Sequence, residues 1–208
     1  MIKWKVGRVI ARPYIGTKKG HFTRTSNRHD YALAPFSKTA LDSLKDAGLD
    51  VIGVGKIPDI FVDQGITRKI KTVSNEDGMN KTIELASDNF NGLAFINLVD
   101  FDAVYGHRRN AAGYGKAIEE FDVQLGELIN ELKNDDLLMV TADHGNDPTY
   151  RGTDHTREQV PLIIYSKQFN EMKVLNDSNS FGIIGSTICD NFNVKYNGIG
   201  SSILELLK

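Results

Sequence analysis

The chain has a single cysteine, Cys189, among its 208 residues, and only five prolines. One cysteine excludes an internal disulfide and is typical of a protein from a reducing compartment. Long apolar runs are also missing, because no stretch approaches the roughly 20 apolar residues that a membrane-spanning helix needs. The first residues mix charged and apolar side chains and do not have the pattern of a signal peptide. We therefore expect a soluble cytoplasmic protein.

An excess of charge of one sign is missing too. The chain carries 25 Lys and Arg against 27 Asp and Glu, which gives a net charge of −2, and both signs are interspersed. This balance favours neither nucleic acid nor an anionic membrane as the main partner. With 40% hydrophobic residues, the chain is long enough to bury one sizeable core.

Short apolar runs and helical periodicities alternate along the chain. Strands are expected at residues 3–12, 51–54, 93–99, 137–140 and 160–166. Helices are expected from Ser37, as N-cap, to Gly48, and at residues 79–89, 115–133 and 180–192, with 13–30 as a loop. The alternation predicts an α/β fold with a mostly parallel sheet and helices on both faces. The helix at 115–133 carries one apolar stripe, from Ile118 to Leu132, that is expected to pack on the sheet.

The strand at 137–140 leads directly to Asp143 and His144, and a polar loop then reaches His155. The carboxyl ends of parallel strands form the edge where ligands bind in open α/β sheets. A carboxylate beside an imidazole suits a divalent cation such as Zn²⁺ or Mn²⁺. The alternative is a simple Asp-His-Gly turn, in which the carboxylate accepts backbone hydrogen bonds.

A second strand end repeats the pattern. The strand at 93–99 runs into Asp100 and Asp102, and His107 follows five positions after Asp102. Two strand ends that each deliver carboxylate and imidazole groups are what a two-metal site requires. Asp100 and Asp102 share one side of an extended chain, so periodicity leaves the choice between them open.

Three segments together resemble the phosphopentomutase family of the alkaline phosphatase superfamily: TADHGNDPTYRGTDHTREQVPLI, NLVDFDAVYGHRRN and RTSNRHDYAL. The resemblance covers essentially the whole chain, but members of the family are roughly twice as long. It implies a partial alkaline phosphatase-like core at residues 35–208. Residues 1–34 would be the end of a small α+β cap domain, with the boundary near 32–36. Apolar cap residues such as Trp4 and Tyr14 are then expected to be unusually exposed.

The resemblance also implies a metal-binding role for five residues. Asp102, His107 and His155 match all the protein ligands of one Mn²⁺, and Asp143 and His144 match ligands of a second Mn²⁺ whose third ligand lies outside this chain. The threonine that carries the phosphoryl group in the family has no counterpart here, so no catalytic nucleophile is assigned. The implied reaction interconverts ribose or deoxyribose 1-phosphate and 5-phosphate. We expect the chain alone to be inactive and to need the missing amino-terminal half, or another chain.

Basic residues supply candidates for binding the pentose phosphate. The loop at 13–30 and the residues before it are rich in arginine, and guanidinium groups bind phosphate in a bidentate manner. A solvated basic surface is the alternative. Phosphopentomutases are thought to hold the sugar phosphate through cap arginines, which favours binding. The candidates are Arg24 and Arg28 first, then Arg8 and Arg12, and Lys56 at a strand end.

Three other functions compete with this interpretation. A related metallo-phosphohydrolase or a cofactor-independent phosphoglycerate mutase would use the same Asp and His chemistry. The spacing of Asp102 and His107 and the segment RTSNRHDYAL favour the pentose enzyme. An inactive module that binds metal or phosphate, or a structural fragment with no metal dependence, would show no turnover.

Overall fold

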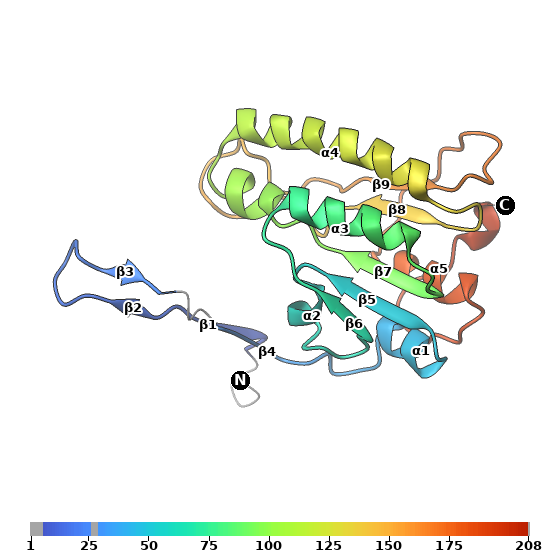
Figure 1. Ribbon diagram of the computed structural model, residues 1–208, viewed down its shortest axis with the longest axis horizontal. Helices are drawn as coiled ribbons and strands as arrows, with labels where there is room; N and C mark the ends of the chain where they lie inside the picture. Colours follow the sequence, from blue (N-terminus) through green and yellow to red (C-terminus); the bar gives the residue numbers. More distant parts are fainter. Residues whose placement is uncertain (1–5, 26–28, 208) are drawn as a thin grey trace.

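A three-stranded parallel sheet forms the centre of the chain. The computed structural model describes residues 6–25 and 29–207. The sheet has the order β6 (Arg68–Ile70), β5 (Asp50–Val54) and β7 (Gly92–Ile96), and β5 pairs in parallel with both neighbours. Because the strands are parallel, β5 and β7 end at the same edge of the sheet, and the segments that follow them meet there (Figure 1).

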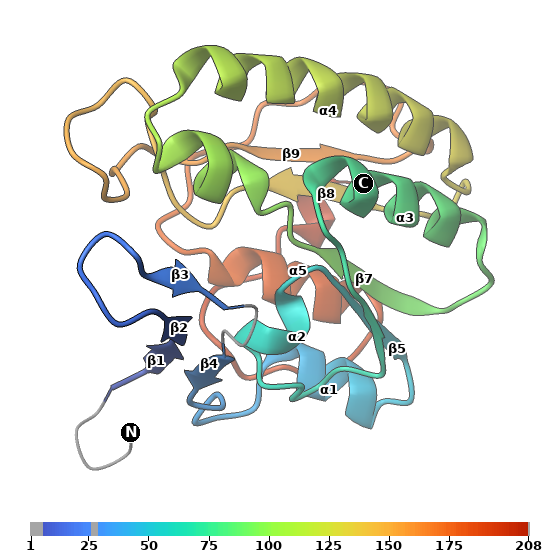
Figure 2. The ribbon, with the colours of Figure 1, turned by 60° about the vertical axis from the view of Figure 1, so that its left-hand side comes forward.

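Helices cover both faces of this sheet. Val51 of β5 is buried on one face against α1 (Ala40–Asp46) and against Cys189 of α5 (Gly182–Asn191). Ile52 and Val54 are buried with Leu85 of α3 (Asn75–Ser87), and α4 (Ala111–Glu131) packs along α3. Figure 2 shows the two helical layers on opposite sides of β5 and β7. The predicted α/β class with helices on both faces is confirmed.

A second, antiparallel ladder is formed by β8 (Leu138–Thr141) and β9 (Leu162–Tyr165). Both strands were predicted. The predicted parallel pairing is found among β5, β6 and β7, whereas β8 and β9 are antiparallel. The connection from β8 to β9 carries the loop with His144 and His155 instead of a crossover helix, so β9 returns beside β8 in the opposite direction.

The starts of two helices differ from the predicted positions, because other residues than expected act as their N-caps. The prediction of Ser37 as the N-cap of α1 is wrong, because Thr39 is the cap and forms a reciprocal capping box with Asp42. Helix α3 starts at Asn75, four residues before the expected Met79, and is capped by Ser74. A short helix, α2 (Ile57–Ile60), lies directly after β5, where no helix was expected. The final segment forms only a short 3₁₀ turn, Leu204–Leu206.

The stripe of α4 is only partly buried. Leu128 is buried, whereas the side chain of Ile118 is 48% exposed. Helix α4 packs mainly on α3 and on the turn Phe101–Gly106, so its apolar residues near the amino end are not covered by the sheet. The predicted helix is therefore confirmed, but the predicted packing of its whole stripe is not found.

The described residues before Pro35 form an arm of two antiparallel strand pairs, one following the other. Strand β1 (Arg8–Ala11) pairs with β4 (His29–Ala32), and β2 (Tyr14–Ile15) pairs with β3 (Thr23–Arg24). The expected loop at 13–30 thus contains strands. Of the strand expected at 3–12, the described residues form only the four-residue strand β1. The arm extends away from the sheet (Figure 1). Tyr14 is 62% exposed, as expected, whereas Trp4 lies outside the described residues. The domain boundary near 32–36 stays a prediction.

In the described ranges, no helix is both long and apolar enough to cross a bilayer.

Substituting Thr39 by alanine is expected to lower the free energy of unfolding by about 1 kcal/mol. The hydroxyl of Thr39 accepts a hydrogen bond from the Asp42 backbone N–H, and the Asp42 carboxylate accepts from the Thr39 backbone. Burial alone would raise the pKa of Asp42, but hydrogen bonds from Thr39 and Gln64 together lower it. The contribution of the Asp42 carboxylate is therefore full above its unfolded-state pKa of about 3.9 and decreases as the pH falls through the lower folded-state pKa.

Urea unfolding of Thr39→Ala and wild type at pH 7 and pH 3 measures this effect. Ser37→Ala is the matched control, because Ser37 is exposed and caps no helix in the structure. Equal losses from the two substitutions would contradict the assignment of Thr39 as the cap.

Candidate metal centre

The chain turns sharply after β7 and brings Asp102 against His107. Residues Phe101–Gly106 form a single π-helical turn, in which the His107 N–H donates to the Asp102 carbonyl. A π-helix closes its hydrogen bonds between residues five apart, so the five-residue spacing places both side chains on one face of the turn. The Asp102 Oδ1 and His107 Nε2 atoms lie 3.4 Å apart.

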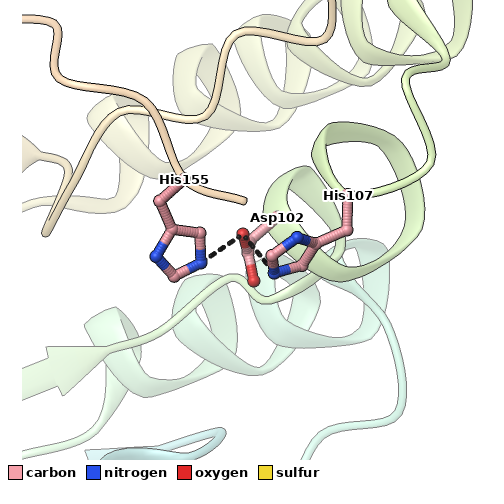
Figure 3. Close-up of side chains that lie close together, drawn as sticks. All are labelled: Asp102, His107 and His155. Atoms are coloured by element: carbon pink, nitrogen blue, oxygen red, sulfur yellow. Dashed lines mark ion pairs between the residues drawn. The ribbon is translucent and has the colours of Figure 1, made fainter. Parts of the chain in front are cut away.

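His155 completes a cluster of three possible ligands. Its Nε2 lies 3.3 Å from the same Asp102 Oδ1, and the ligand atoms of Asp102, His107 and His155 all lie within 4.8 Å of one another. Figure 3 shows the two imidazoles converging on the carboxylate from different segments. The three side chains are between 34% and 46% exposed, so a cation can reach them. One anionic oxygen and two neutral nitrogens form a donor set that suits Zn²⁺ or Mn²⁺.

The tautomer of His107 is set by the loop after β8. Its Nδ1 lies 2.5 Å from the Thr153 carbonyl oxygen, which can only accept, so Nδ1 carries the proton and donates. The Nε2 of a neutral His107 therefore has its lone pair directed at the cluster. Hydrogen bonds of this kind orient metal-binding imidazoles in proteins. The residues present thus fit a bound cation in their chemistry as well as in their spacing.

Asp143 and His144 lie beside this cluster and outside it. The His144 ring stacks on His155 with centroids 3.7 Å apart and planes 17° apart, and its Nε2 lies 3.7 Å from Asp143 Oδ1. The two strand ends therefore converge as expected. Within residues 6–25 and 29–207, no third His, Cys, Asp or Glu joins this pair in a metal-binding group.

Asp100 has a different partner from Asp102. Its carboxylate accepts a hydrogen bond of 2.8 Å from the Asn75 N–H, and its own N–H donates to Asn75 Oδ1. This reciprocal pair joins the end of β7 to the start of α3. Asp102 is consequently the carboxylate that faces the histidines, which the sequence periodicity alone left undecided.

Two residues near the cluster were not predicted from the sequence. Asn146 is buried, and its amide N–H donates a hydrogen bond of 2.6 Å to Asp102 Oδ1. Arg109 donates in turn to Asn146 Oδ1 over 2.8 Å. Both lie in the quoted motifs, next to expected ligands. The only signal in the sequence that could have identified them is that they are polar and lie close to expected ligands. The sequence does not show which of Arg108 and Arg109 turns toward the cluster.

Neighbouring pKa shifts agree with this arrangement. Burial, followed by the negative charge of Asp102, raises the pKa of Tyr114. In the loop after β8, hydrogen bonds from the side chain and backbone of Thr149 lower the pKa of Asp147. The Asp147 carboxylate thus holds a local turn near the start of the loop that carries His155.

The structure does not join the described candidate phosphate-binding residues to the cluster. Arg8, Arg12 and Arg24 lie on the extended arm, and Arg28 lies outside the described residues (Figure 1). Lys56 follows β5 at the edge of the sheet where β7 also ends. In the part of the chain that the structure describes, the side chains of Arg8, Arg12 and Lys56 form no hydrogen bond or ion pair with the cluster. Their role stays a prediction.

A broad groove of about 2100 Å³ opens along β8, β9 and the segment between β9 and α5. Asp143 and His144 line it, together with strongly exposed apolar side chains: Ile163, Met172, Val174 and Phe181. We refer to it as the β8–β9 groove. Exposed apolar side chains gathered in one groove are typical of a surface that contacts other polypeptide.

Comparison with known proteins gives close relatives. The phosphopentomutases of Agathobacter rectalis and Clostridium botulinum are each 59% identical to this chain over 207 residues, and that of Clostridium tetani is 58% identical. The matches cover 99% of this chain and 52% of each relative, so the chain spans about half the length of the relatives. The model of the Metalloenzyme superfamily matches residues 11–196. The chain therefore belongs to the Metalloenzyme superfamily.

Proposed function

We propose that this chain is the metal-binding part of a phosphopentomutase. The single observation that carries the proposal is the Asp102, His107 and His155 cluster, found in a chain that is 59% identical to phosphopentomutases. The proposed cation is Mn²⁺. A divalent cation at this position would neutralise charge on the phosphoryl oxygens, which is the main requirement of phosphoryl transfer.

A second Mn²⁺ is part of the proposal. Asp143 and His144 would bind it, with a third ligand from polypeptide that corresponds to the remainder of the relatives' length. The nearness of His144 to His155 supports this, because two-metal sites hold their cations about 3.5 to 4 Å apart. We further propose that this polypeptide fills the β8–β9 groove, where it would cover the exposed apolar side chains and reach Asp143.

The substrate is proposed to be ribose or deoxyribose 1-phosphate and 5-phosphate, in a cytoplasmic setting. The phosphorylated threonine would come from the same additional polypeptide, and the arginines of the arm and Lys56 would bind the sugar phosphate. The chain alone is then a cation-binding module without mutase activity, which the missing nucleophile favours. A related phosphohydrolase or phosphoglycerate mutase is the alternative.

A chimera tests the function directly. In the Agathobacter rectalis phosphopentomutase, the segment that matches this chain is replaced by this chain, and interconversion of ribose 1-phosphate and ribose 5-phosphate is followed by phosphorus NMR. We expect Mn²⁺-dependent turnover by the chimera and none by the chain alone. A folded chimera that binds Mn²⁺ but hydrolyses the substrates, or leaves them unchanged, would contradict the proposal. Turnover by the chain alone would contradict the proposed dependence on further polypeptide.

A further inference from the structure

The side chain of Arg109 connects the π-helical turn to the loop that carries His155. Its Nε donates to the Gly152 carbonyl at 2.5 Å, and its Nη2 donates to the Asp154 carbonyl at 2.6 Å. The Nη1 group is within hydrogen-bond distance of the Gly106 carbonyl, the Asp147 carbonyl and Asn146 Oδ1. The planar guanidinium with its fixed fork of donors suits several carbonyl groups at once, which a lysine ammonium does not.

Three consecutive carbonyls of the loop are held from the turn. Arg109 binds those of Gly152 and Asp154, and His107 Nδ1 binds the one between them, at Thr153. His155 is the next residue along the chain. The backbone directly before His155 is therefore held by contacts from His107 and Arg109, in the segment that also carries Asp102.

Arg109 also determines which way the buried Asn146 amide faces. A guanidinium can only donate, so Asn146 must direct its Oδ1 at Arg109 and its NH₂ group at Asp102. The amide then donates to the carboxylate oxygen that both histidines face. Gly106 lies so close to Asn146 that an added Cβ would be 2.5 Å from Nδ2, which leaves the amide no space to shift in that direction.

The backbone of Arg109 has an uncommon conformation. Its φ is +53°, a left-handed value that residues other than glycine seldom adopt. Such values persist where surrounding contacts hold the residue, and they concentrate at functional sites. The hydrogen bonds of Arg109 supply those contacts.

The geometry points to Arg109 as a positioning residue that, through Asn146 and the carbonyls of residues 152–154, holds Asp102, His107 and His155 ready for a divalent cation. This inference rests on the proposed metal site. Arg109 itself donates only hydrogen bonds and does not bind the cation. It acts on affinity because a preformed cluster needs no ordering of the loop when the cation binds.

The test compares Arg109→Lys and Arg109→Ala with Arg108→Ala in the full chain. Arg108 is the matched control, because it is exposed and makes no hydrogen bond or ion pair within the described ranges. Mn²⁺ affinity is measured by calorimetry, and amide hydrogen exchange is measured without metal. We expect both Arg109 variants to bind Mn²⁺ roughly 10- to 100-fold more weakly, as is usual for residues that orient metal ligands. Exchange should become faster only at residues 146–156.

The two readouts separate a positioning role from general stabilisation. Affinity equal to that of Arg108→Ala, or exchange that increases throughout the chain, would overturn the inference. If wild-type protein binds no Mn²⁺, the proposed metal site fails, and the exchange pattern alone then decides whether Arg109 orders the loop. Retention of tight binding by Arg109→Lys would likewise show that the fork of donors is not required.

Discussion

The Asp102→Asn variant is expected to bind Mn²⁺ about 100-fold more weakly than the wild-type chain, a difference of about 2.7 kcal/mol. The substitution keeps the shape of the side chain but removes the only anionic group of the cluster. Both imidazole Nε2 atoms, of His107 and His155, face the oxygen whose charge is lost. Calorimetric titration of metal-free protein measures the change.

Asp100→Asn is the matched control, because the same substitution occurs two residues away. The Asp100 carboxylate accepts from the Asn75 N–H and belongs to the junction with α3, so its loss should affect stability and leave Mn²⁺ affinity within about twofold. If Asp100→Asn weakens Mn²⁺ binding as strongly as Asp102→Asn, the assignment of Asp102 as the ligand is wrong.

Leu44→Ala is expected to lower the free energy of unfolding by about 3 kcal/mol, within the 2–5 kcal/mol range for buried leucines. Leu44 has no exposed surface and lies in the core formed by α1, β5 and α5. Its removal leaves a cavity among rigid elements, because β5 is hydrogen-bonded on both sides and cannot close over it. Urea unfolding gives the free-energy difference.

Val123→Ala on α4 provides the comparison for Leu44→Ala. Val123 is 65% exposed, and its truncation should change the free energy of unfolding by less than about 0.5 kcal/mol. A cost for Leu44→Ala that is no greater than that for Val123→Ala would mean that the face of β5 covered by α1 and α5 is not a packed core.

The sheet and its helical layers were predictable because burial leaves a strong pattern in the sequence. Val51, Ile52 and Val54 form a continuous apolar run, as expected for a central parallel strand that is covered on both faces. The start of α3 was missed because NEDGMN has the composition of a turn. Gly78 is instead a helical glycine that lies against Leu98, where a Cβ would approach the Leu98 side chain to 2.9 Å. Such a tertiary contact is not visible in composition.

Polar composition concealed the strands of the arm. Residues 13–30 are rich in Lys, Thr and Arg, which favours a loop, yet β2 and β3 pair on either side of Gly16 and Gly20, both at positive φ. The rings of Tyr14 and Phe22 pack edge to face with centroids 5.1 Å apart, but both side chains, like Ile15, stay more than half exposed. Without a buried face, the alternation that identifies a strand is absent.

The candidate ligands could be named from the sequence, but their arrangement could not. The spacing in the sequence allowed either Asp102 or Asp100 as the partner of His107. Only the π-helical turn shows that Asp102 faces His107, whereas Asp100 accepts a hydrogen bond from Asn75. His155 was assigned through resemblance, and the structure brings it to Asp102 across a 53-residue separation. Arg109 and Asn146 were overlooked because their importance lies in the direction of their hydrogen bonds, which depends on the folded loop.

Pulsed electron paramagnetic resonance of one equivalent of Mn²⁺ bound to the chain tests the central claim most directly. With ¹⁵N-labelled histidine, the account predicts hyperfine couplings from two directly bound imidazole nitrogens, and from only one in His155→Ala or His107→Ala. A Mn²⁺ signal without ¹⁵N-histidine coupling, as expected for an ion bound through water or surface carboxylates, would contradict the assignment of Asp102, His107 and His155 as a preformed metal centre.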